Sequence, residues 1–241
     1  MKEALLVHGW DPRFYNTKLS SDVESGIAWK DRSGLIKLLN QKYDVRYFNL
    51  PGFCGAPEPT KNKFDVEDFT DYLANWIKLK NKPDIIIGYS FGGVVALDYR
   101  FRYDSSIPTV LISPALIRSE SLGSRIAHLA KNKMPLGALG EFKKYYQYFL
   151  SRYYREGTLF LRESYDQIVR RDMSFLLGKV KVDGLLLIYG TNDDTTPWRL
   201  VKEKALQLGI EHCLIEAGEH NIGQTHPRKI FEAINDFLKD G

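Results

Sequence analysis

DIIIGYSFGGVVALDY, residues 84–99, places one serine, Ser90, between two apolar runs, with glycines at positions 88, 92 and 93. A solvated loop needs no apolar flank on both sides, and a plain core segment needs no three glycines. Apolar runs of this length are typical of a buried strand and of the buried face of a helix, and glycines permit tight turns. The segment therefore predicts a sharp strand-to-helix turn at Ser90.

Short apolar runs alternate with amphipathic stretches along the rest of the chain. Strands are predicted at 4–7, 45–50, 84–89, 109–113, 185–189 and 213–217, and helices at 30–41, 66–79, 91–102, 198–208 and 227–239. Alternation of strand and helix is typical of parallel sheets, and continuous apolar strands indicate that both sheet faces are covered. We expect an α/β fold, a mostly parallel six-stranded sheet with helices on both faces.

One segment interrupts this alternation of strands and helices. Residues 115–180 are too many for a crossover between neighbouring strands, and their pattern is helical. We expect a helical cap, or lid, inserted over the carboxyl edge of the sheet. The predicted division is a core of residues 1–114 and 181–241 and a cap of residues 115–180.

Composition is that of an ordinary globular protein. The chain has 241 residues, 44% hydrophobic and 27% charged, with a net charge of +4. No nucleic-acid motif or long basic run is present, so no nucleic-acid partner is expected. With two cysteines, a four-residue apolar run near the N-terminus and no apolar stretch near 18 residues, we expect a cytoplasmic protein without an integral membrane segment. The oligomeric state stays open.

The turn itself has a chemical interpretation. Residues 88–92 read G-x-S-x-G, between a predicted strand and a predicted helix, as that motif requires. Small residues on either side let neighbouring backbone approach the serine closely. The N-terminus of the following helix favours negative charge that develops nearby. These features predict an exposed serine nucleophile.

At this point the sequence resembles the α/β-hydrolase superfamily over nearly the whole chain outside the cap. The order nucleophile, acid, histidine is the order that this fold requires. The first strand already leads into a His-Gly motif, so the family's first two strands are not expected here. The resemblance implies a compact six-stranded member with a Ser-His-Asp triad.

A serine hydroxyl needs a base within hydrogen-bond reach. Among five histidines, His220 follows the last predicted strand, in EAGEHNIG (216–223), and matches the family's position for the base. His226 is the rival, although its place before Pro227 suggests a capping or surface role. The other histidines are His8 in the first loop, His128 in the cap and His212 just before a predicted strand.

The orienting carboxylate should follow the strand at 185–189, in the segment YGTNDDTTP (189–197). Asp193 and Asp194 both qualify by position. In similar hydrolases the acid stands three residues after the glycine and four before the proline, which selects Asp193. Asp194 is then interpreted as a turn or capping carboxylate.

An oxyanion needs hydrogen-bond donors that are in place before the reaction. One expected donor is the backbone N–H of Phe91, and the other is that of Trp10 in His8-Gly9-Trp10, which resembles the family's oxyanion motif. Gly9 would allow close approach, and His8 would brace the loop. Cys54, in NLPGFCG (49–55), has no base placed to activate it and is not expected to be a nucleophile.

The expected cap differs in charge from the rest of the chain. Residues 115–181 hold 13 Lys and Arg against 6 Asp and Glu, whereas the remainder holds 21 against 24. Aromatic and basic residues interleave over 143–165. An amphipathic cap that packs its aromatics on the core is the favoured interpretation. An entrance for anionic substrates, an anionic lipid surface and single-stranded nucleic acid are the alternatives.

The sequence thus predicts a serine hydrolase that acts on a small-molecule acyl substrate, a carboxylic ester by default. Ser90, His220 and Asp193 would be catalytic, Trp10 and Phe91 would form the oxyanion hole, and no metal or organic cofactor is required. Thioesterase, carbon–carbon hydrolase, aminopeptidase and acyltransferase chemistry would use the same residues. A non-catalytic, ligand-binding protein with the hydrolase fold is the alternative to an enzyme.

Overall fold

The computed structural model describes residues 1–18, 25–117, 152–169 and 171–239. Its centre is one six-stranded sheet in the order β2-β1-β3-β4-β5-β6, and every neighbouring pair is parallel. The strands are β1 Lys2–Val7, β2 Tyr43–Phe48, β3 Ile85–Tyr89, β4 Thr109–Ile112, β5 Leu185–Gly190 and β6 Glu211–Ile215. The predicted six-stranded α/β fold is confirmed.

The strand order reverses between β1 and β3. The chain passes from β1 outward to β2 and then returns past β1 to β3, before it continues to β6. Connections on the two sides of such a point leave in opposite directions, which opens a crevice at the carboxyl ends of the strands. Ser90 follows β3 and the His8-Gly9-Trp10 loop follows β1, so both predicted elements lie at this crevice.

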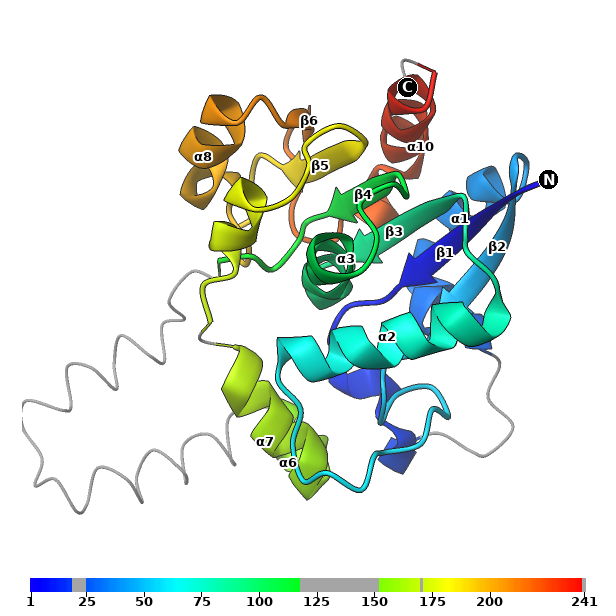
Figure 1. The fold of residues 1–241 in the computed structure, drawn as a ribbon, viewed down its shortest axis with the longest axis vertical. Coiled ribbons are helices and arrows are strands. Elements are labelled where there is room, and N and C mark those ends of the chain that lie inside the picture. The colour runs from blue at the N-terminus through cyan, green and yellow to red at the C-terminus, as the bar shows by residue number, and fades with distance from the viewer. Residues whose placement is uncertain (19–24, 118–151, 170, 240–241) are drawn as a thin grey trace, which may run out of the picture.

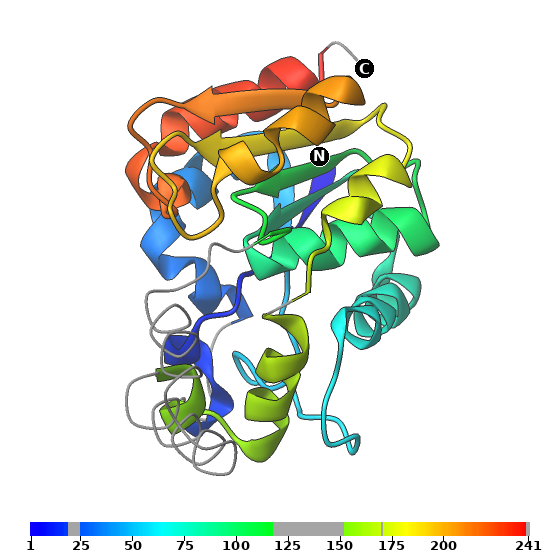
Figure 2. The ribbon, with the colours of Figure 1, turned by 90° about the vertical axis from the view of Figure 1, so that its left-hand side faces the viewer.

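Helices cover both faces of the sheet. α1 (Ser33–Leu39) and α10 (Pro227–Phe237) pack together on one face, and α2 (Val66–Lys80) and α3 (Phe91–Arg102) on the other (Figure 1). The turned view shows α10 in red and α3 in green on opposite sides of the strands (Figure 2). The central strands are therefore shielded on both faces, and β3, β4 and β5 are buried at every residue.

Local sequence explains where individual helices begin and how they pack. α2 starts at a capping box in which the Asp65 side chain accepts from the Asp68 N–H and the Asp68 side chain accepts from the Asp65 N–H. α3 is buried through residue 100, where the Arg100 guanidinium donates to backbone carbonyls that include that of Ile107. None of the helices in the described parts of the chain has the length and apolar character that a bilayer crossing requires.

The last strand lies two residues earlier than predicted. The prediction placed it at 213–217 with His212 before it, but β6 runs over Glu211–Ile215 and contains His212, whose ring stacks on Trp198 at 5.0 Å. β6 is an edge strand, and its first two residues are exposed polar side chains. The prediction followed the apolar run, which begins two residues after the strand itself begins.

Two predicted helices are shorter than their apolar patterns. The first three residues of the helix predicted at 30–41 belong to a 3-10 segment, η3 (Ser25–Arg32), and α1 starts only at Ser33. The helix predicted at 198–208 divides into η5 (Trp198–Leu200) and α8 (Lys202–Gln207). α9 (Ile222–Thr225), a single turn after β6, was not predicted.

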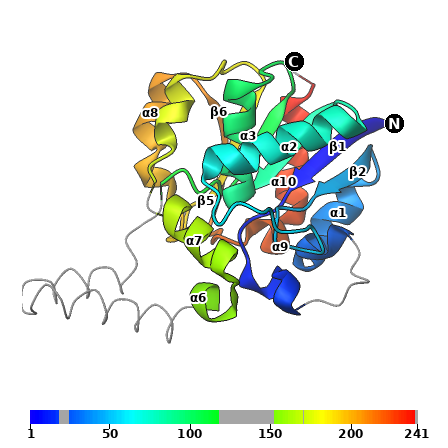
Figure 3. The same cartoon turned by 60° about the horizontal axis from the view of Figure 1, so that its bottom comes forward.

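The predicted cap is described only in part, because residues 118–151 lie outside the described residues. The Met173 N–H donates to the Leu116 carbonyl at 2.8 Å, so the long excursion leaves and rejoins the core at one place. Within it, α7 (Leu159–Ile168) lies beside the start of α2 (Figure 3). α6 (Arg152–Glu156) packs against the short 3-10 helix η1 (Pro12–Phe14) in the loop after β1. η4 (Ser174–Gly178), in the last predicted part of the cap, packs against α3 and α8 of the core. The domain division itself stays a prediction.

Candidate active site

Ser90 stands at a strained turn between β3 and α3. Its backbone has φ 53° and ψ −114°, a conformation that costs a non-glycine residue about 1–3 kcal/mol. A Cβ at Gly88 would lie 2.5 Å from the Gly92 carbonyl oxygen, and one at Gly92 would lie 2.2 Å from that of Val7. The two glycines of G-x-S-x-G are thus required by backbone packing, which holds the serine in its strained conformation.

The loop after β1 lies against the serine. A Cβ at Gly9 would stand 3.0 Å from the Ser90 Cβ, so only glycine fits without displacement. The ring of His8 fixes this loop, because its Nδ1 donates to the Gly9 carbonyl at 2.7 Å and its Nε2 accepts from the Leu50 N–H at 3.1 Å. The predicted bracing role of His8 agrees with these contacts.

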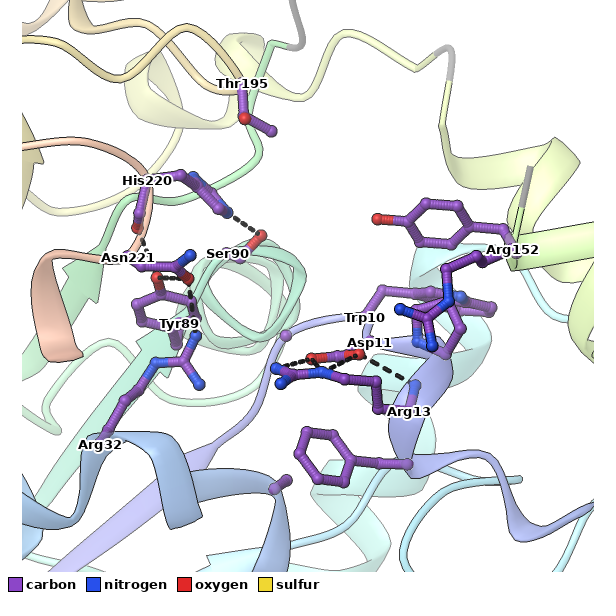
Figure 4. A pocket seen from close by; sticks show the side chains of 15 residues that line it. Trp10, Asp11, Arg13, Arg32, Tyr89, Ser90, Arg152, Thr195, His220 and Asn221 are labelled. Atoms are coloured by element: carbon purple, nitrogen blue, oxygen red, sulfur yellow. Dashed lines mark hydrogen bonds and ion pairs between the residues drawn. The ribbon is translucent and has the colours of Figure 1, made fainter. Parts of the chain in front are cut away.

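His220 reaches Ser90 from the loop between β6 and α9. Its Nε2 lies 3.1 Å from the Ser90 Oγ (Figure 4). Its Nδ1 lies 2.9 Å from the Asp193 Oδ2. Three side chains predicted from separate parts of the sequence therefore form one continuous hydrogen-bonded chain. Such a chain can take a proton from the serine hydroxyl as it attacks a carbonyl group.

Asp193 is held by the turn that follows β5. Its carboxylate accepts from the backbone N–H groups of Thr195 and Thr196 at 2.8 and 2.9 Å and from the Thr196 hydroxyl at 2.8 Å. Burial alone would raise the pKa of Asp193, but the hydrogen bonds from His220 and Thr196 lower it to about 2. The carboxylate is therefore ionised at neutral pH and can stabilise a charged imidazole.

Asp194 takes no part in this chain. Its side chain is 95% exposed and lies 3.8 Å from the Arg199 guanidinium, whereas the Asp193 side chain is fully buried. Of the two carboxylates that qualified by position, the fold brings Asp193 to His220.

Residues that the sequence did not single out position the imidazole. The Tyr89 hydroxyl donates to the His220 carbonyl, and Thr196 lies 3.2 Å from the His220 Nδ1 through its hydroxyl. Thr196 belongs to a run of Asp and Thr residues before a proline, which is a recognisable turn signal. Tyr89 has no such signal, because an aromatic residue at the end of a buried strand reads as core.

The two residues expected to supply the oxyanion donors are neighbours in the fold. The indole of Trp10 lies edge-on to the Phe91 ring at 5.5 Å, so the loop after β1 and the start of α3 are adjacent. Within the described residues, the N–H groups of Trp10 and Phe91 donate no hydrogen bond to a protein acceptor. Both therefore remain able to bind a ligand oxygen.

A cavity of about 310 Å³ opens onto the serine and the imidazole. Its walls come from the loop after β1, the end of η3, the ends of β3 and β5, α6 and the loop after β6. The lining residues are Gly9, Trp10, Asp11, Pro12, Arg13, Phe14, Ala28, Arg32, Tyr89, Ser90, Arg152, Tyr153, Thr195, His220 and Asn221. The volume suits a small organic substrate.

The rival residues lie in other environments. His226 hydrogen-bonds the neighbouring Thr225 hydroxyl at 2.8 Å, and His128 is outside the described residues. Burial raises the pKa of the Cys54 thiol to about 12, so it is protonated and a poor nucleophile at neutral pH. In the parts of the chain that the structure describes, no group of three His, Cys, Asp or Glu side chains is placed to hold a metal ion.

Comparison with known proteins decides the family. A model of the alpha/beta hydrolase family matches residues 4–233, which is most of the chain. The chain is an α/β-hydrolase. The G-x-S-x-G turn and the chain order of serine, aspartate and histidine are both features of this family.

Curated relatives of this hydrolase include two proteins named pimeloyl-[acyl-carrier protein] methyl ester esterase. One, from Neisseria meningitidis serogroup C, is 25% identical and matches 99% of this chain and 94% of that protein. Another, from serogroup B, is 25% identical over 100% of this chain and 94% of that protein. The hydrolase thus matches nearly the full length of these relatives.

Solved structures share the fold. A bromoperoxidase from Bacillus anthracis superposes with a TM-score of 0.67 at 18% identity, over 99% of this chain and 92% of that one. A putative aryl esterase from Burkholderia cenocepacia gives 0.65 at 16% identity, over 99% and 90% of the two chains. These similarities establish architecture alone.

Buried His8 makes the stability of the hydrolase dependent on pH. Burial lowers the pKa of His8 from 6.5 to about 4, against the opposing effect of its hydrogen bond to Gly9. The unfolded chain binds a proton on His8 below pH 6.5, while the folded chain does so only below about pH 4. The free energy of unfolding should therefore fall by roughly 3 kcal/mol across this window as the pH falls.

Urea unfolding at pH 7 and pH 5, for the wild type and for His8→Gln, measures this contribution. The glutamine variant should be less stable at pH 7 and should lose less stability on acidification, because it cannot titrate. Equal losses in the two proteins would show that His8 is not the responsible group.

Proposed function

We propose that this hydrolase is a serine carboxylesterase that works through Ser90, His220 and Asp193. The observation that carries the proposal is the hydrogen-bonded chain of these three side chains at the wall of the cavity. The curated relatives, which are named as esterases, support the choice of an ester over other acyl bonds.

In the proposed first half-reaction, the Ser90 Oγ attacks the ester carbonyl while His220 takes the serine proton on Nε2. His220 then gives that proton to the departing alcohol, and the acyl group stays on Ser90. Asp193 keeps the His220 Nδ1 protonated, so that Nε2 faces the serine as a base, and stabilises the charged ring. In the second half-reaction a water molecule, deprotonated by His220, attacks the acyl carbonyl. The bond to the Ser90 Oγ then breaks, His220 returns the proton to that oxygen, and the acid is released.

The backbone N–H groups of Trp10 and Phe91 are proposed to bind the oxyanion of both tetrahedral intermediates. They belong to adjacent elements that flank Ser90, and the N-terminus of α3 adds its dipole. The mechanism uses protein groups and water alone.

The substrate is proposed to be a methyl ester or another ester of a small alcohol on an acyl chain. The names of the Neisseria relatives specify a methyl ester of an acyl chain on a carrier protein, which makes such esters the first compounds to test. We also propose that residues 115–180 form a cap over the cavity, because Arg152 and Tyr153 of α6 line it.

The proposal is tested by labelling with a fluorophosphonate, which reacts with an activated serine, beside turnover of methyl esters of increasing acyl length. The wild type should be labelled and should hydrolyse esters, and Ser90→Ala should do neither. A folded wild type that is not labelled and turns over no ester would favour the ligand-binding alternative over an esterase.

A further inference from the structure

Arg32, the last residue of η3, is a buried cation at the wall of the cavity. It is 8% exposed and lines the same cavity as Ser90 and His220. Its guanidinium lies over the ring of Tyr89, with Cζ 3.8 Å from the ring centroid (Figure 4).

The hydrogen bonds of Arg32 are incomplete. Its Nη2 donates a long bond of 3.4 Å to the Asn221 Oδ1, and its buried Nε has no partner within the described part of the chain. No carboxylate among the described residues forms an ion pair with it. Burying a guanidinium without a counter-charge costs several kcal/mol unless a ligand supplies one.

The other arginines of the cavity are neutralised. Arg13 pairs with Asp11 at 2.6 Å and with Asp31 at 2.7 Å, and Arg152 lies 3.4 Å from Glu156. Asp11 is the carboxylate of the cavity wall, and both of its oxygens accept from the Arg13 guanidinium. Of the three arginines that line the cavity, Arg32 is thus the one that forms no ion pair with a carboxylate among the described residues.

We propose that Arg32 binds a carboxylate of the substrate, so that the hydrolase prefers esters that carry a second, ionised carboxyl group. This rests on the proposed function, whose reacting serine shares the cavity. A guanidinium fork matches the two oxygens of a carboxylate. A monoanion matches the single guanidinium of Arg32, whereas a phosphate monoester would bring close to two negative charges beside Asp11.

A purely structural role is the competing explanation. A Cβ at Gly223 would lie 3.1 Å from the Arg32 Cδ, so the stem of Arg32 packs on α9. Tyr89, beneath the guanidinium, donates to the His220 carbonyl. Loss of Arg32 could therefore displace His220 and reduce the turnover of every ester alike. The test must separate this effect from substrate recognition.

Matched substrates provide the separation. Monomethyl glutarate and monomethyl adipate carry an end carboxylate, and methyl pentanoate and methyl hexanoate are comparable chains without it. In Arg32→Met, which keeps an apolar stem, kcat/KM for the charged esters should fall roughly 10- to 100-fold, mainly through KM. The uncharged esters should fall by a much smaller factor, and Arg32→Lys should retain part of the preference.

Arg46→Met is the matched control. Arg46 also lies over an aromatic ring, that of Trp76 at 4.7 Å, but it pairs with Glu3 and does not line the cavity. Its loss should leave the ratio of charged to uncharged turnover unchanged. 4-Acetoxybutanoate, with the carboxylate on the alcohol part, forms a second arm that tells which part of the substrate meets Arg32.

Two outcomes would overturn the proposal. In one, the wild type hydrolyses neither the monomethyl half-esters nor 4-acetoxybutanoate better than uncharged esters. In the other, Arg32→Met lowers kcat/KM for charged and uncharged esters by the same factor. Calorimetric titration of the folded wild type and Arg32→Met with adipate adds a readout independent of catalysis. Arg32-dependent adipate binding without turnover of any ester would leave this site standing and would remove only the esterase function.

Discussion

Ser90→Ala, His220→Ala and the double variant should all show the same residual ester hydrolysis, on the order of 10⁴- to 10⁶-fold below the wild type in kcat. The reason is that, under the proposed mechanism, Ser90 and His220 act as one unit. Without the 3.1 Å contact between the His220 Nε2 and the Ser90 Oγ, neither the nucleophile nor the base has a function. Steady-state kinetics on one methyl ester with the three variants measures this directly.

Folding must be checked in the same experiment. Ser90→Ala leaves a small side chain at a strained φ of 53°, so its thermal unfolding should be compared with that of the wild type. Additive losses, with the double variant far below either single one, would contradict a shared proton-transfer step.

Asp193→Asn should lower kcat by roughly 10⁴-fold, because an amide can present a donor to the His220 Nδ1 and so stabilise the wrong imidazole tautomer. The amide also loses the charge that would stabilise the protonated ring. The Asp193 carboxylate, with a pKa of about 2, is ionised throughout the range in which such an enzyme would be assayed. Comparison of kcat at neutral pH measures the effect.

The next residue supplies the control. Asp194→Asn changes the same chemical group at an almost fully exposed position, 3.8 Å from Arg199, and should leave kcat within about twofold of the wild type. If the two variants lost activity equally, the assignment of the acid to Asp193 would be wrong.

Much of the core could be predicted because its signals are local. The continuous apolar runs predicted six strands, and the glycines around Ser90 predicted the turn that their backbone contacts require. The edge strand β6 was misplaced by two residues, since its exposed polar start gives no apolar signal. Strand order was not predicted, because it depends on contacts between distant segments.

The candidate site also contains residues that local sequence predicts and residues that it does not. Ser90, His220 and Asp193 each stand beside a strand end, where the resemblance to a known family gives them a role, and the structure brings them together. Tyr89, which holds His220, and Arg32, which lines the cavity, have no such marker. Arg32 follows the charged residues Lys30 and Asp31, and it is buried by contacts with distant segments, the ring of Tyr89 and the helix α9.

The placement of His220 after the last strand has a consequence for synthesis. The serine and the loop that flanks it are made early, but the base follows β6, near the end of the chain. A chain on the ribosome can therefore fold its first strands around an inert serine, since proteins fold from the N-terminus during translation. Under the proposed mechanism, esterase activity would begin only when β6 has joined the sheet. The onset of activity during synthesis would therefore mark the moment at which the sheet is complete.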